Sequence, residues 1–126
     1  MGISSYRDLI AWQKAMDFVV GCYQAAEQFP RTEQFGLCSQ LQRAAVSIPA
    51  NIAEGQGREH TREFINHLSI ARGSLCEAET HILIAERLGY LKPESVQPLL
   101  SMSEEIARIT YGLIAALERR LNADKS

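Results

Sequence analysis

The polar side chains whose spacing suggests a shared role lie in one stretch of this chain. They recur every three or four residues, the spacing of one helix face, and are Gln40, Arg43, Ser47, Asn51 and Glu54, followed by Arg58 and Arg62. The arginines of this polar stripe could bind RNA phosphates. The same stripe could instead form a buried or interfacial hydrogen-bond network that fixes helix register or subunit contacts. Interleaved glutamates neutralise much of the charge and no aromatic residues are interleaved for base stacking, so we favour the structural interpretation.

Signals for metal binding or catalysis are weaker. His60, Glu63 and His67 could share one exposed helix face, but solvated polar side chains explain this spacing better. The three cysteines are far apart, without a CxxC pair, and are Cys22, Cys38 and Cys76. No phosphate-binding loop or nucleophile elbow is present in the sequence. We therefore predict no catalytic residue, metal, cofactor or small-molecule substrate, and keep a metal-dependent enzyme only as a remote alternative.

Composition indicates a single domain over residues 1–126. Hydrophobic residues make up 46% of the chain and charged residues 22%, and the formal net charge is −2. This balance supports a packed core and does not by itself require a nucleic acid or an anionic membrane as partner. No apolar run reaches the roughly 18 residues of a membrane span, and no signal peptide is evident. We expect a cytoplasmic protein.

Four helical segments must position the polar stripe. Apolar periodicity predicts helices over about residues 5–27, 33–56, 61–88 and 93–121, with Ser5 and Thr32 as candidate N-caps. Because the connections are short, we expect consecutive helices to pack antiparallel, as an all-α, up-down-up-down four-helix bundle.

Pro49 lies inside the second segment, where a proline costs roughly 3 kcal/mol. Small residues surround it, and Gly73 and Ser74 interrupt the third segment. We expect these small residues to allow a close contact between the two helices, and Pro49→Ala to weaken assembly if a bend there shapes an interface.

Some apolar residues lie outside the main helix seams. They are Ile10, Phe18, Val20, Ile65, Ile70, Leu83, Ile84, Leu100, Tyr111 and Ile114. A single bundle would expose part of this surface, and symmetric self-association is the simplest way to cover it.

Several motifs resemble one known family. They are LIAWQKA at residues 9–15, EQFGLCSQLQRAAVSIPANIAEGQGR at 33–58, EFINHLSIARGSLCEAET at 63–80 and LGYL at 88–91. With them the chain resembles the four-helix-bundle proteins encoded in intervening sequences of bacterial large-subunit (23S) rRNA genes. The resemblance implies a ring-like homopentamer without established enzymatic activity. It also implies kinship with the accessory proteins of diversity-generating retroelements, which bind nucleic acid.

These observations lead to two hypotheses. The first is a non-enzymatic homo-oligomer, a pentamer by resemblance, that acts as a scaffold or interaction module. The alternative is an accessory protein that binds structured RNA. Under either hypothesis the candidate contact residues are Arg43, Ser47, Asn51, Glu54, Arg58 and Arg62.

Overall fold

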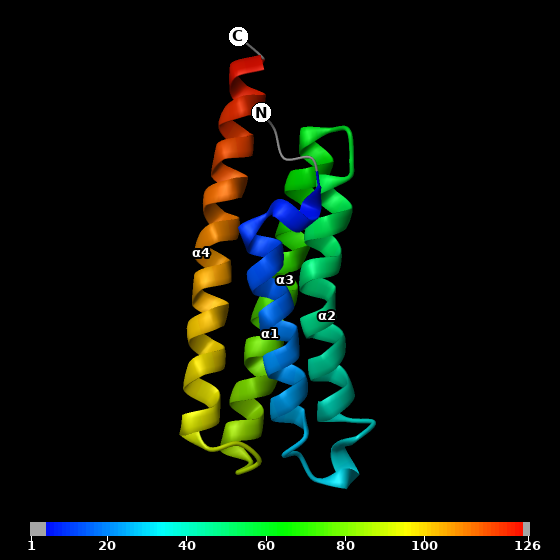
Figure 1. The fold of residues 1–126 in the computed structure, drawn as a ribbon, viewed down its shortest axis with the longest axis vertical. Helices are drawn as coiled ribbons and strands as arrows, with labels where there is room; N and C mark the ends of the chain where they lie inside the picture. The colour runs from blue at the N-terminus through cyan, green and yellow to red at the C-terminus, as the bar shows by residue number, and fades with distance from the viewer. Residues whose placement is uncertain (1–4, 125–126) are drawn as a thin grey trace.

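A computed structural model describes residues 5–124 of the chain. Within that range the regular elements are all helical, as predicted: η1 (Tyr6–Asp8), α1 (Ile10–Ala26), η2 (Arg31–Glu33), α2 (Leu37–Gln56), α3 (Thr61–Arg87) and α4 (Pro93–Asp124). The α1–α2 and α3–α4 connections lie at one end of the molecule and the α2–α3 connection lies at the other (Figure 1). The last turns of α4 project beyond the other helices.

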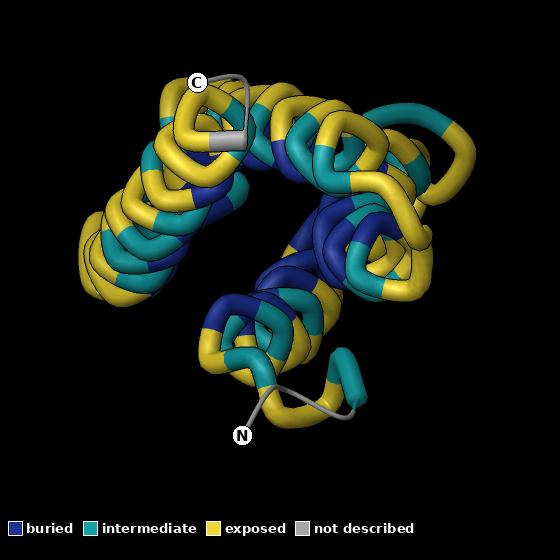
Figure 2. The backbone as a smooth tube through the Cα atoms, turned by 90° about the horizontal axis from the view of Figure 1, so that it is seen from above, coloured by how far each residue is buried: buried dark blue, intermediate teal, exposed yellow. Residues whose placement is uncertain are grey.

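The four long helices surround one core. Each helix packs on its neighbours in chain order, α4 also packs on α1, and the α2–α3 contact is the most extensive. Seen from above, α1 and α3 occupy opposite corners, and the buried residues face the centre (Figure 2). The largest fully buried side chains come from every long helix and include Phe18, Leu41, Ile48, Ile52, Leu68, Ile82 and Ile106.

The predicted outer apolar residues divide into two groups. Phe18 and Ile114 are buried in the core, and Ile65 and Leu100 are half-buried against it, so these four do not form an outer face. The others are exposed and are Ile10, Val20, Ile70, Leu83, Ile84 and Tyr111. A substantial apolar surface therefore remains on the outside of the bundle.

The first two long helices begin later than the sequence predicts. Residues 6–8 form a separate turn, in which the Ser5 Oγ accepts a hydrogen bond from the Arg7 N–H at 3.2 Å. Residues 31–33 form another, and the Glu33 Oε1 accepts from the Leu37 N–H at 3.0 Å. Glu33 therefore satisfies the start of α2, in place of the predicted cap Thr32.

The other two long helices match more closely. α3 ends at Arg87, one residue earlier than predicted, and α4 continues to Asp124 instead of residue 121. α2 remains helical on both sides of Pro49, whose side chain is buried. Burial of the proline ring helps to offset its cost inside the helix.

Candidate functional site

Half-buried polar side chains connect α2 to α3. The hydroxyls of Ser47 and Ser74 lie 2.9 Å apart across the helix pair. The Asn51 Nδ2 donates to the main-chain oxygen of Ser47 at 2.9 Å and to its Oγ at 3.0 Å. Two residues of the polar stripe are therefore engaged inside the α2–α3 contact.

His67 completes this network. Because the Asn51 amide nitrogen faces two acceptors, its Oδ1 is left to accept a hydrogen bond from His67, whose Nδ1 lies 3.1 Å away. This arrangement places a proton on the His67 Nδ1. We refer to Ser47, Asn51, His67 and Ser74 as the α2–α3 network. Its contacts link the two helices at a defined register.

A close backbone approach lies beside the network. A Cβ added to Gly55 would stand 2.6 Å from the His67 Cβ and 3.0 Å from a ring carbon of Phe64. Only a glycine fits at this point without moving one of the helices. Gly73 was expected to share the close contact, and that prediction is wrong, because a Cβ at Gly73 would meet no atom within 4 Å. Its neighbour Ser74 makes the contact instead.

The charged end of the polar stripe forms ion pairs. The Arg58 guanidinium lies 2.8 Å from the Glu54 Oε1, and its Nε lies 3.8 Å from the Glu63 Oε2. All three side chains are about half exposed, so each pair contributes little to stability. The two carboxylates nevertheless reduce the positive charge that Arg58 offers to a phosphate.

Arg43 and Arg62 lie at separate places on the surface. Arg43 is exposed beside two shallow hollows, of about 490 and 380 Å³, which flank Ser47. Arg62 lines a hollow of about 360 Å³ that also includes His60 and Leu121. The polar stripe is therefore not one continuous site.

The hollow beside Arg62 is also lined by Leu121, from another part of the chain. The end of α4 lies beside the α2–α3 connection, and it carries the exposed Arg119 and Arg120. Arg62, Arg119 and Arg120 therefore lie toward the same end of the bundle, as do Glu59 and Glu118. The sequence patterns did not single out Arg119 and Arg120, although the expected up-down-up-down topology already places the end of α4 at the same end as the α2–α3 connection.

Polar contacts also link the other helices. The Lys14 Nζ lies 2.5 Å from the Glu105 Oε1 and joins α1 to α4. The hydrogen bond with Lys14 lowers the pKa of Glu105. Ser103 donates a hydrogen bond to Glu79 and joins α4 to α3.

A further contact joins the α1–α2 connection to the α3–α4 connection. Tyr90 donates to the Glu33 Oε2 at 2.9 Å. Because the carboxylate accepts the phenolic proton, this bond raises the pKa of Tyr90.

The residues considered for metal and nucleophile chemistry are dispersed. Within residues 5–124 no three His, Cys, Asp or Glu side chains are grouped as a metal site, so His60, Glu63 and His67 do not form one. The three cysteines are free, and burial raises the pKa of Cys22 to about 12. The buried His81 Nδ1 has no hydrogen-bond partner among the described residues.

None of the helices described is long and apolar enough to cross a membrane.

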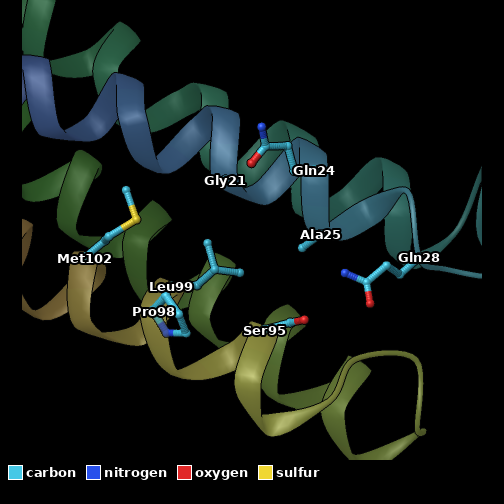
Figure 3. Close-up of a pocket in the computed structure, with 8 residues that line it drawn as sticks. All are labelled: Gly21, Gln24, Ala25, Gln28, Ser95, Pro98, Leu99 and Met102. Carbon is cyan, nitrogen blue, oxygen red and sulfur yellow. The ribbon is translucent and has the colours of Figure 1, made fainter.

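A hollow of about 290 Å³ lies between α1 and α4. Its lining is mixed, with apolar atoms between amide and hydroxyl groups, and is formed by Gly21, Gln24, Ala25, Gln28, Ser95, Pro98, Leu99 and Met102 (Figure 3). A Cβ at Gly21 would lie 2.8 Å from a methyl carbon of Leu99. The missing side chain at Gly21 therefore makes room for Leu99 between the two helices.

Comparison with known proteins places this architecture in a family. No curated protein matches the chain. A crystal structure of a protein of unknown function from the S23 ribosomal protein family of Bacteroides thetaiotaomicron VPI-5482 is similar, with a TM-score of 0.77 and 25% sequence identity. The similarity covers 83% of this chain and 98% of that one. The 23S rRNA-intervening sequence protein family matches residues 7–112. The chain therefore belongs to the 23S rRNA-intervening sequence protein family.

Proposed function

We propose that this protein is a non-enzymatic, cytoplasmic scaffold or interaction module, an antiparallel four-helix bundle that assembles into a homopentameric ring. The observation that carries the proposal is the presence of two separate exposed apolar patches. The α1 patch consists of Met16, Val20 and Tyr23 with Val46 of α2 beside them. The residues that we call the α3 patch are Ile84 and Leu88, one helical turn apart at the end of α3, and Ile70, about four turns earlier on the same side of the helix.

The positions of the two patches favour a head-to-tail contact. Helices α1 and α3 stand at opposite corners of the bundle (Figure 2), so one copy cannot bring both patches together by itself. If the α1 patch of one copy meets the α3 patch of the next, both patches are covered and the contact repeats around a closed ring. The number of five subunits rests on the family resemblance.

Two charged variants test the proposal. Val20→Glu places a charge in the α1 patch, and Ile84→Glu places one in the α3 patch. Each alone should dissociate the assembly in sedimentation equilibrium, whereas Gln97→Glu on the exposed side of α4 serves as a control and should not. A 1:1 mixture of the two variants should form heterodimers, since one undamaged contact remains. A wild-type monomer at micromolar concentration would contradict the proposal.

A second candidate function is binding to structured RNA. The observation that favours it is that Arg62, Arg119 and Arg120 lie toward the same end of the bundle, in a chain whose family is described as 23S rRNA-intervening sequence proteins. Exposed arginines near one another can neutralise several phosphates at once. Nearby glutamates weaken this field, so we place RNA binding second to assembly.

Arginine variants at the two ends of α3 test RNA binding. Arg62→Ala should weaken binding to structured 23S rRNA fragments and reduce the slope of log K against log salt by about 1 if one phosphate contact is lost. Arg87→Ala serves as a matched control because Arg87 is exposed at the opposite end of the same helix. An absence of binding at low salt would exclude this function.

A further inference from the structure

Phe35 is exposed to an unusual degree. It lies on the α1–α2 connection with 89% of its surface accessible, more than any other large hydrophobic residue that the structure describes. An aromatic side chain gains much from burial. The exposed ring of Phe35 could therefore serve as an anchor residue that is buried when a partner surface binds.

The segment that presents Phe35 is held from both sides. Glu33 accepts hydrogen bonds from the Leu37 N–H at 3.0 Å and from the Tyr90 hydroxyl at 2.9 Å. The rings of Phe29 and Tyr90 pack with their centroids 5.8 Å apart. Because these contacts fix the connection on either side of Phe35, little conformational entropy is lost when the ring is bound.

The hollow between α1 and α4 is suited to receive such a ring. Leu99 and Met102 point from α4 toward α1, and Gly21 adds no side chain on the facing helix (Figure 3). Gln24 and Gln28 also line the hollow, and the Gln28 side chain points into the space between α1 and α4 (Figure 3). The hollow and the α1–α2 connection lie toward the same end of the bundle, the lower end in Figure 1.

We infer that Phe35 of one copy of this chain inserts into the α1–α4 hollow of the next copy. The inference rests on the proposed assembly and adds a specific contact to it. Phe35 lies on the α1–α2 connection, two residues before α2, whereas the hollow lies between α1 and α4. The exposed ring and the hollow are therefore different parts of the surface of one copy. Because the two contacting surfaces differ, the contact is head-to-tail, the type that can close into a ring.

Site-directed crosslinking tests this contact. In a Cys38→Ser, Cys76→Ser background, the pair Gln34→Cys and Gln24→Cys keeps the Phe35 ring and places one thiol beside it on the connection and one at the rim of the hollow. A short bismaleimide should then yield a covalent ladder that ends at the closed oligomer, and neither single cysteine should yield it. Separately, Phe35→Ala should weaken self-association about 30-fold per contact, and Gln34→Ala, the adjacent exposed residue, should not.

Other results would overturn the inference in distinguishable ways. If Gln34→Cys alone crosslinks two copies, the Phe35 segment lies at a symmetric contact and not in the hollow. If no crosslink forms between positions 34 and 24 while light scattering still shows an intact oligomer, the inference fails and the proposed assembly stands. If the wild-type chain is monomeric, both fail. Circular dichroism of Phe35→Ala should match the wild type, since this side chain lies outside the core.

Discussion

Two glycine-to-alanine substitutions should have opposite effects on stability. Gly55 and Gly73 both lie within helices, where replacement of glycine by alanine gains up to about 1 kcal/mol of helix propensity. At Gly73 the new methyl group meets no atom within 4 Å. We therefore expect Gly73→Ala to raise the free energy of unfolding by about 0.5–1 kcal/mol.

Gly55→Ala should lower the free energy of unfolding. The new Cβ would lie 2.6 Å from the His67 Cβ and 3.3 Å from the main-chain oxygen of Phe64. Neither atom can move by a side-chain rotation, so α2 and α3 must separate locally. Overpacking of this kind costs about 1–3 kcal/mol, and Gly55 gains less propensity because it is the penultimate residue of α2. We expect a net loss of about 1–2 kcal/mol.

Urea unfolding at one protein concentration measures both effects. With a slope near 2 kcal/mol per molar urea, the midpoint should fall by roughly 0.5–1 M for Gly55→Ala and rise by roughly 0.3–0.5 M for Gly73→Ala. Light scattering on the same samples shows whether the oligomeric state has changed. A Gly55→Ala variant as stable as the wild type would refute the idea that a rigid α2–α3 approach requires this glycine.

The remaining predictions concern the polar contacts and the cysteines. Asn51→Ala should destabilise the fold by about 1–3 kcal/mol, because it removes two hydrogen bonds to Ser47 and leaves the His67 Nδ1 without its partner Asn51; a loss in urea unfolding below about 0.5 kcal/mol would contradict this. The double variant Ser47→Ala, Ser74→Ala should lose less stability than the sum of its single variants, since they share one hydrogen bond; simple additivity would show that this bond is not formed. The stability difference between the wild type and Lys14→Met should be present above pH 4.5 and decline as the pH falls through the lowered pKa of Glu105; a difference unchanged at pH 3 would exclude the Lys14–Glu105 pair as its source. A thiol reagent at pH 8 should label the exposed Cys76 first and Cys22 only after unfolding, because burial raises the pKa of Cys22 to about 12; mass spectrometry of the labelled peptides checks the order.

Helical periodicity predicted the long elements of the fold better than their starts. The four helical segments follow from apolar spacing, which the burial of the core requires. The start of α2 depends instead on Glu33, which accepts from both Leu37 and Tyr90. Because Tyr90 lies 57 residues away, nothing in the local sequence around Glu33 indicates this contact.

Gly55 and Gly73 illustrate which features of the α2–α3 contact could be predicted from the sequence. Ala71 and Leu75 mark the buried side of α3, and helical geometry directs position 73 away from it. The same periodicity could therefore have excluded Gly73 from the contact. Gly55 is different, because its importance depends on how closely α3 approaches, and that distance is set by the packing of the whole helix pair.

The distinctive segment around Pro49 is explained by architecture. Its proline is buried, Gly55 permits a close approach of α3, and Ser47 and Asn51 are engaged in the α2–α3 network. Side chains already engaged in this way have little capacity left for a ligand. Variants of the network should therefore affect any function only through stability, whereas variants at Phe35 or Arg62, which lie outside the core, should alter assembly or RNA binding while the fold remains intact. Stability and binding measured on the same variants separate these two groups of residues.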